Sequence, residues 1–192
     1  MVKEHLEELY CRRRLSMMQV AQRLQTTHAT VLYWLKKHRI PRRSWSESTC
    51  AKLNPNGDPF TIPAALSPRQ QELLRLGLML YWAEGAKTQT SVRIANLDVR
   101  MLQLFLSFLR EVCHVRESRL RLSVRVYRQF SLRAAKTYWM RLLRLPASRV
   151  FIYPHTDERS QEGQQCSPYG LATLEFSNVK FRRWLDHTIE MY

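Results

Sequence analysis

Glu84 ends an apolar run in a chain that has few acids. The run covers residues 76–87, LGLMLYWAEGAK, and the glutamate is followed by a glycine, an alanine and a lysine. The chain carries 31 Lys and Arg residues but only 16 Asp and Glu residues. Glu84 is therefore either an ordinary residue at the end of a helix or a functional group that the helix positions. Both alternatives stay open, because buried or perturbed acids occur at functional sites and also elsewhere.

Positive charges occupy alternate positions of one predicted strand. In residues 119–128, RLRLSVRVYR, leucine and valine alternate with polar residues. The charged and aromatic positions are Arg119, Arg121, Arg125 and Tyr127, and Arg128 follows them. Because side chains alternate across a strand, the pattern predicts a sheet with one apolar and one cationic face. From residue 119 to residue 149 there are nine Lys or Arg and no Asp or Glu, which favours nucleic-acid contact over an ordinary solvated surface.

The overall charge narrows the class of partner. The formal net charge of +15 in 192 residues implies a polyanion, either nucleic acid or an anionic membrane surface. No apolar run is long enough to span a bilayer, and no helix pattern combines a basic polar face with an aromatic apolar face. The N-terminal residues include acids where a signal peptide has an apolar core. We expect an intracellular protein that binds nucleic acid and not membrane.

Cysteine and histidine predict no metal site. The four cysteines are scattered without a CxxC pair, and the six histidines form no HExxH pattern. Structural zinc needs ligands at short, paired spacing, so we expect reduced thiols and no zinc.

The first 45 residues predict three helices. Ser16 and Thr27 are suitable N-caps, and a preceding helix from about residue 4 to residue 13 completes a small bundle. Pro41 ends the last helix, and only residues 25–27 separate the two capped helices. The residues expected to face the core are Met18, Ala21 and Leu24 in one capped helix and Val31, Leu32 and Leu35 in the other.

This pattern resembles the helix-turn-helix of bacterial regulators and recombinases, in which a run like LxxxEIAxxLGVSxxTVxxWLKKxGIPRR recurs. The matching residues are Leu15, Val20, Ala21, Leu24, Thr27, Thr30, Val31, Trp34, Leu35, Ile40, Pro41, Arg42 and Arg43. Gln25 stands at the turn glycine of the family and should add some strain to the turn.

The resemblance implies that the second capped helix enters the major groove of DNA. The residues on or near its outward face are His28, Ala29, Thr30, Tyr33 and Lys37. Phosphate contacts are expected from Lys36, Arg39, Arg42 and Arg43. A small helical bundle that binds protein is the alternative.

Residues 46–66 are predicted to be a linker between a domain at 1–45 and a domain at 67–192. The stretch from residue 44 to residue 67 holds three prolines and one glycine and has no sustained period, and its NPNGDP run predicts a turn. Ser67 then offers an N-cap, and Pro68 suits the first position of a helix.

The second domain alternates helices and strands. A helix at 68–84 is apolar on nearly every side, so we expect it to be buried on nearly every side, with Gly77 marking a close neighbour. Strand patterns follow at 91–97, 119–128, 150–153 and 169–176, and helix patterns at 98–112, 132–143 and 179–191. We predict an α+β fold in which helices cover one side of a mostly antiparallel sheet and the other side is basic.

The order of these segments resembles the LAGLIDADG homing endonucleases, in a bacterial and archaeal group that often carries an N-terminal helix-turn-helix. The motif places its final glycine at Gly85, its last acid at Glu84, its small residue at Ala83 and its middle leucine at Leu80. The runs ANLD with FLSFLREV, YWMRLLRLP and YGLATLEF extend the resemblance over about residues 66–192. Met79 replaces the inner glycine of the motif and Trp82 another acid. The resemblance implies an α/β-sandwich with a basic antiparallel sheet.

Two roles are implied by this resemblance. In the family, two such helices pack side by side, and their terminal acids help to hold divalent ions over the scissile phosphates. Carboxylate oxygens suit Mg²⁺ as ligands, and the ions stabilise the attacking and leaving oxygens. With one motif per chain, cleavage requires a homodimer through helix 68–84, with Glu84 of each subunit as metal ligand and Lys87 and Arg93 as candidate charge stabilisers. The fold also occurs without cleavage in bacterial transcription regulators, which need no cofactor.

We therefore predict a sequence-specific, double-stranded DNA-binding homodimer with a regulatory role in the prokaryotic cytoplasm, associated with the nucleoid. The alternative is a Mg²⁺-dependent, site-specific endonuclease. RNA binding ranks below both, because a major-groove helix has no place in A-form RNA.

Overall fold

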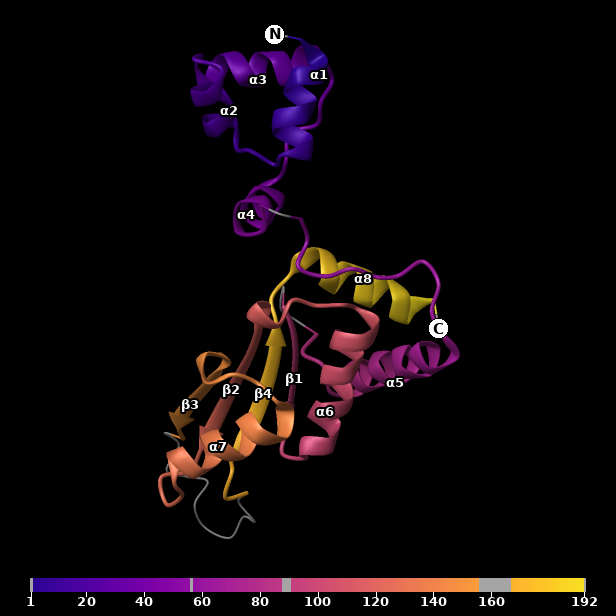
Figure 1. Cartoon of the computed structure of the whole chain (residues 1–192), viewed down its shortest axis with the longest axis vertical. Helices are drawn as coiled ribbons and strands as arrows, with labels where there is room; N and C mark the ends of the chain where they lie inside the picture. The colour runs from indigo at the N-terminus through magenta and orange to yellow at the C-terminus, as the bar shows by residue number, and fades with distance from the viewer. Residues whose placement is uncertain (1, 56, 88–90, 156–166, 192) are drawn as a thin grey trace. The chain divides into compact units, whose positions relative to one another are not determined.

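The structure is a computed structural model that describes residues 2–55, 57–87, 91–155 and 167–191. The chain forms two compact units, which Figure 1 colours from indigo to yellow along the sequence. We call Met1–Pro59 the helical unit and Phe60–Tyr192 the sheet unit. The division falls inside the segment 46–66 that the sequence predicts as a linker.

The helical unit begins with the predicted three-helix arrangement. Its helices are α1 (Lys3–Leu6), continued by the π-helix η1 (Glu7–Arg12), then α2 (Met17–Arg23) and α3 (His28–Lys37). Ser16 Oγ accepts a hydrogen bond from Gln19 N, and Thr27 Oγ1 accepts one from Thr30 N, so both predicted N-caps are confirmed. The core of this bundle is Leu6, Leu9, Tyr10, Val20, Ala21, Val31, Leu35 and Ile40.

One predicted core residue of α2 is wrong. Met18 is 67% exposed, whereas Met17 and Leu24 pack against the core beside Val20 and Ala21. Positions 17, 20, 21 and 24 follow the i, i+3, i+4, i+7 spacing of one helix face, and Met18 lies off that face.

The predicted linker is not extended throughout. Residues 45–53 form α4 (Trp45–Leu53), in which Ser44 Oγ accepts from Glu47 N while the Glu47 carboxylate accepts from Ser44 N. This capping box satisfies backbone donors at both ends of the first turn and explains why a helix forms in a segment without an apolar period. Farther along, Phe60, Ile62 and Leu66 pack on the core of the sheet unit.

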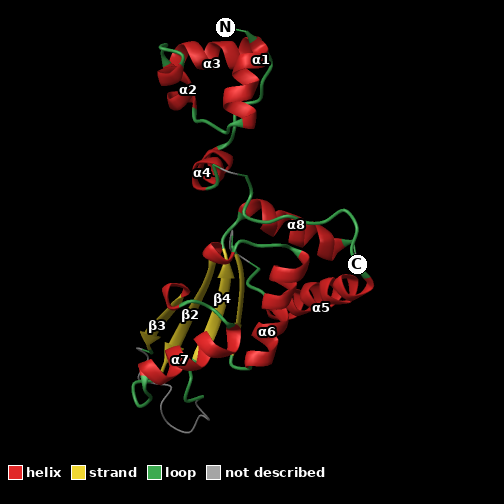
Figure 2. Ribbon diagram, viewed as in Figure 1, coloured by secondary structure: helices red, strands yellow, loops and turns green. Residues whose placement is uncertain are grey.

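The described residues of the sheet unit form a four-stranded sheet. Helices cover one face of this sheet (Figure 2). Its strands are β1 (Val92–Asn96), β2 (Leu120–Val126), β3 (Val150–Pro154) and β4 (Leu171–Phe176), in the order β1-β4-β2-β3. Its helices are α5 (Pro68–Glu84), α6 (Val99–Ser107) continued by η2 (Phe108–Val112), α7 (Leu132–Leu143) and α8 (Val179–Glu190), with short 3₁₀ turns η3 (Glu117–Arg119) and η4 (Ala147–Arg149) before β2 and β3. The α+β class is confirmed.

The sheet is mostly antiparallel, as the pattern predicts, but one pairing is parallel, which differs from the antiparallel sheet that the resemblance implies. Strand β4 pairs antiparallel with β1 and with β2, but β2 and β3 are parallel. A parallel pair needs a crossover of a dozen or more residues, and α7 lies in the connection between β2 and β3. The alternation predicted for β2 is confirmed, because Leu120, Leu122, Val124 and Val126 are fully buried under the helices while Arg121 and Arg125 are exposed.

Helix α5 is buried on one side only, contrary to the prediction. Leu74, Leu78 and Tyr81 face the core, and a Cβ at Gly77 would collide with the ring of Phe108 from η2. The close neighbour of Gly77 is therefore inside the same chain. The opposite side, which we call the α5 face, consists of Leu76, Met79, Trp82 and Ala83 and is exposed.

Candidate nucleic-acid interface

The residues predicted to contact DNA from α3 lie on its exposed side. His28, Ala29 and Tyr33 are exposed, Thr30 is half-buried, and Lys36 and Lys37 are exposed near the C-terminal end. Lys37 Nζ lies 4.8 Å from the centroid of the Trp34 ring, a distance suited to a cation–π contact. The helix thus presents small and polar groups at its start and cations at its end.

The turn before α3 has the geometry that the sequence suggests. Gln25 has φ 48°, in the left-handed region, and its N–H donates to Gln22 O at 3.3 Å while Thr26 N–H donates to Ala21 O at 2.9 Å. These two bonds close α2 in the way that a glycine usually allows. The turn strain expected at Gln25 is therefore present, since a side chain in this region is unfavourable.

Arg43 is held inside the helical unit. Its guanidinium donates to Arg14 O at 3.1 Å and to Tyr10 O at 3.2 Å, and it also bonds to Leu15 O. Its carbon Cζ lies 4.1 Å from the centroid of the Tyr10 ring. These contacts satisfy carbonyls in η1 and in the residues after it, so Arg43 has a structural role, and its phosphate contact stays a prediction. Arg39 and Arg42 are exposed.

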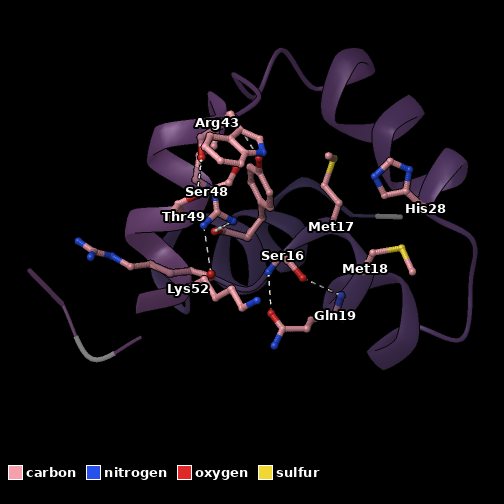
Figure 3. Close-up of a pocket in the computed structure, with 12 residues that line it drawn as sticks. Ser16, Met17, Met18, Gln19, His28, Arg43, Ser48, Thr49 and Lys52 are labelled. Carbon is pink, nitrogen blue, oxygen red and sulfur yellow. Dashed lines mark hydrogen bonds between the residues drawn. The ribbon is translucent and has the colours of Figure 1, made fainter. Parts of the chain in front are cut away.

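A groove beside the starts of α2 and α3 contains residues that the sequence analysis missed. It has a volume of about 580 Å³, and Figure 3 shows Met17, Met18, Gln19 and His28 on one side and Ser48, Thr49 and Lys52 of α4 on the other. Trp45 also lines it and is 88% exposed. The capping pair at Ser44 and Glu47 is the sequence signal that could have located α4.

The open face of the sheet forms a second and larger groove. We call it the sheet groove; its volume is about 1030 Å³. It is lined by Arg93, Ala95, Arg121, Ser123, Arg125, Tyr153, Pro154, His155, Leu171, Thr173 and Glu175. The register places Ala95, Thr173 and Ser123 side by side across three strands, so the floor is made of short side chains between charged ones.

Arg93 is paired within this groove. Its Nη2 lies 2.9 Å from Glu175 Oε1, which also accepts a hydrogen bond from Ser177 Oγ at 2.8 Å. Burial alone raises the pKa of Glu175, but the hydrogen bonds from Ser177 and Arg93 outweigh it and hold the pKa below its ordinary value of 4.5. Part of the charge that the sequence assigns to Arg93 is therefore neutralised by a carboxylate.

Arg121 and Arg125 lie nearer the β3 side of the groove. Arg121 donates from Nη2 to Tyr153 Oη at 2.9 Å, and its Cζ is 4.4 Å from the centroid of the Phe151 ring. Tyr127 follows the end of β2 and stacks on His155, with ring centroids 4.6 Å apart. Arg119 lies in η3, half-buried, and Arg128 is exposed in the turn after β2, so neither lies on the strand itself. The aromatic residues of β3 were not predicted as site residues.

Glu84 is exposed at a helix end that is firmly held. Gly85 N donates to Tyr81 O at 2.8 Å, and a Cβ at Gly85 would collide with the Tyr81 carbonyl. The guanidinium of Arg182, a residue only 8% exposed, donates to Ala86 O at 2.7 Å and to Lys87 O at 3.1 Å. The Lys87 ammonium bonds to the carbonyl of Trp82 and so caps α5.

The described part of one chain does not by itself form a magnesium site. No group of three His, Cys, Asp or Glu side chains that could hold a metal occurs among the described residues. Glu84 could contribute a single carboxylate, so further ligands would have to come from a second subunit and from DNA phosphates.

Comparison with family models, with curated proteins and with solved structures finds no match to this chain. Within the part of the chain that the structure describes, no helix has the length and apolar character needed to cross a membrane.

Proposed function

We propose that the protein binds double-stranded DNA through two surfaces, the sheet groove and the exposed side of α3. The observation that carries this proposal is the sheet groove, in which Arg121 and Arg125 flank a floor of short side chains. A cationic strand surface of this kind can approach a duplex and place side chains in its groove. The net charge of +15 supplies the long-range attraction that such binding requires.

The helical unit supports the same ligand. A helix with an exposed N-terminal half suits the major groove of B-DNA, which is about 12 Å wide, and the cations Lys36, Arg39 and Arg42 suit the phosphates beside it. The deep, narrow major groove of an RNA helix does not admit a helix in this way, so duplex RNA is a poorer ligand.

The α5 face supports a homodimer. Leu76, Met79 and Trp82 are 41%, 68% and 66% exposed, and a groove of about 440 Å³ lies beside them against Ile189 of α8. An apolar helix face of this composition is unusual on a monomer surface and can pack against its own copy about a two-fold axis. A symmetric dimer would bind a near-palindromic site, which suits a regulatory role.

DNA cleavage is the second candidate function. The observation that favours it is the exposed Glu84 carboxylate, which makes no hydrogen bond or ion pair to the described residues and ends the helix that carries the α5 face. When bound between two subunits and a phosphate, Mg²⁺ would stabilise charge on the phosphate oxygens. The described residues of one chain supply no further ligands beside Glu84, so we rank binding without cleavage first.

Selection followed by incubation with magnesium tests both functions. Bound duplexes are recovered from a random library in Ca²⁺, with an excess of duplex RNA as competitor. The recovered duplexes are then incubated in Mg²⁺ with the parent and, in parallel, with the Glu84→Ala variant. Recovery of a related set of duplexes that stay intact supports the DNA-binding function. Double-strand breaks by the parent and none by the variant would support the endonuclease, and no enrichment of any duplex would overturn both.

A further inference from the structure

Arg121 is the arginine of the sheet groove that two aromatic side chains hold in place. Its guanidinium lies over the Phe151 ring at 4.4 Å and donates to the Tyr153 hydroxyl at 2.9 Å. Both partners come from the neighbouring strand β3, where they occupy alternate positions and so share the open face. The plane and the direction of the guanidinium are therefore fixed before any ligand binds.

A fixed orientation of the guanidinium favours hydrogen bonds with a defined direction and has little effect on attraction by charge alone. A free arginine loses rotamer freedom when it is ordered, and an arginine ordered in advance loses less on binding. Attraction between charges tolerates many orientations, whereas two parallel hydrogen bonds, to a base edge or to a phosphate, require the fork of the guanidinium to point one way. Arg125 lies on the same strand and face and is exposed, so it offers a comparison within the same surface.

The surroundings of Arg121 weaken its attraction for a phosphate. The register places Glu175 of β4 directly opposite Arg121, and Glu175 in turn opposite Arg93 of β1. Side chains in such cross-strand pairs are close neighbours, so Glu175, although paired with Arg93, lowers the positive potential that a phosphate would meet at Arg121. A base edge carries no net charge and depends less on that potential.

The next row of the sheet leaves room for a base. Ala95, Thr173 and Ser123 form that row, and none of these side chains extends as far as an arginine. Among the four bases, guanine presents two acceptors, O6 and N7, on its major-groove edge, and a planar guanidinium matches them with two donors.

We propose that Arg121, oriented by Phe151 and Tyr153, donates two hydrogen bonds to O6 and N7 of a guanine and so determines specificity at one base pair of each half-site. This proposal rests on the DNA-binding function proposed above. Arg121 is the specificity-determining residue, and Tyr153 and Phe151 are positioning residues.

The test removes the N7 acceptor one guanine at a time. Duplexes from the selection are made with single 7-deazaguanine substitutions, and dissociation constants are measured for the parent, Arg121→Ala, Arg125→Ala and Tyr153→Phe. The readout is the ratio of the two dissociation constants, substituted to unsubstituted, for each protein. Loss of one positive charge weakens binding to both duplexes alike and cancels in this ratio.

We expect one guanine position, with its symmetry mate, at which the parent and Arg125→Ala show a ratio of about 5 or more, the lower end for a bidentate contact. At that position Arg121→Ala should show a ratio near 1, and Tyr153→Phe an intermediate ratio at unchanged charge. The inference is overturned if Arg121→Ala keeps every sensitivity of the parent, or if the parent binds its duplexes without sensitivity at any guanine. Failure of the parent to bind any duplex would instead refute the proposed function, and the inference with it.

Discussion

The two cationic surfaces differ in how their side chains are held. On the helical unit, Lys36, Arg39 and Arg42 are exposed beside α3 and extend from a helix end. In the sheet groove, Arg93 is paired with Glu175 and Arg121 is fixed by Phe151 and Tyr153. The first arrangement suits attraction to phosphates at many positions, and the second suits contacts with a defined direction. The comparison shows that residue type and charge alone do not identify which arginines are free to contact a ligand.

Arg42 and Arg43 provide the sharpest test of that comparison, because they are adjacent and differ in their contacts. Arg43→Ala removes three hydrogen bonds to carbonyls and a stack on Tyr10, so we expect about 2–4 kcal/mol lower stability of the helical unit. Arg42→Ala should change stability by less than about 0.5 kcal/mol and weaken DNA binding. Amide hydrogen exchange in α2 and α3 measures the first effect, and equal protection in both variants would show that Arg43 is not structural.

A charge placed on the α5 face tests whether two copies of the protein dimerise through this face. Met79→Glu places a carboxylate in the proposed contact, and we expect the dimer dissociation constant to rise at least about tenfold. Leu132→Glu is the matched control, since Leu132 is an exposed leucine at the start of α7. Sedimentation velocity measures both variants. If the parent forms no dimer, or if Met79→Glu dimerises with the same dissociation constant as the parent, the α5 face is not a dimer interface.

Glycine at position 25 should stabilise the helical unit. Gln25 has a φ of 48°, which glycine adopts without a side-chain penalty, so Gln25→Gly is expected to raise stability by about 1 kcal/mol. The measurement is the urea midpoint of the unit. Gln22→Gly in the last turn of α2 is the control and should lower stability, by up to about 1 kcal/mol, because there glycine only loses helix propensity. A loss of stability in both variants would contradict the left-handed geometry of the turn.

Acid should remove the stability contributed by the Arg93–Glu175 pair of the sheet groove, and we expect this effect to be smaller than the three above. The folded pKa of Glu175 lies below its ordinary value of 4.5, so its carboxylate contributes stability that is fully present above about pH 4.5. That contribution is lost as the pH falls through the folded pKa. Glu175→Gln should therefore show a shallower fall of stability in acid than the parent, measured by urea unfolding between pH 3 and pH 6. Identical slopes would mean that the Arg93–Glu175 pair does not stabilise the fold.

Local patterns in the sequence predicted the helices, their caps and the alternation of β2, because these depend on residues close together in the chain. Helix α7 begins and ends at the predicted residues, and Ser16 and Thr27 cap as expected. The parallel pairing of β3 was missed, although a strand, a helix and a strand in succession are typical of it.

Roles that depend on distant partners could not be predicted. Arg43 meets Tyr10, which is 33 residues away in the sequence, and no local pattern distinguishes it from Arg42. The same holds for Arg93 and Glu175, which are 82 residues apart. Phe151 and Tyr153 could have been found, since they occupy alternate positions of a predicted strand and must share one face.

The most direct test of the central claim, that both units contact one duplex, is the salt dependence of binding. The logarithm of the binding constant is measured against the logarithm of salt concentration for the parent, Arg42→Ala, Arg125→Ala and the double variant. The control is Arg141→Ala, at an exposed residue of α7. We predict that each single substitution reduces the slope by about 0.9, that the double variant reduces it by about 1.8, and that Arg141→Ala leaves it unchanged. A slope for Arg125→Ala equal to that of Arg141→Ala would show that the sheet groove does not contact DNA.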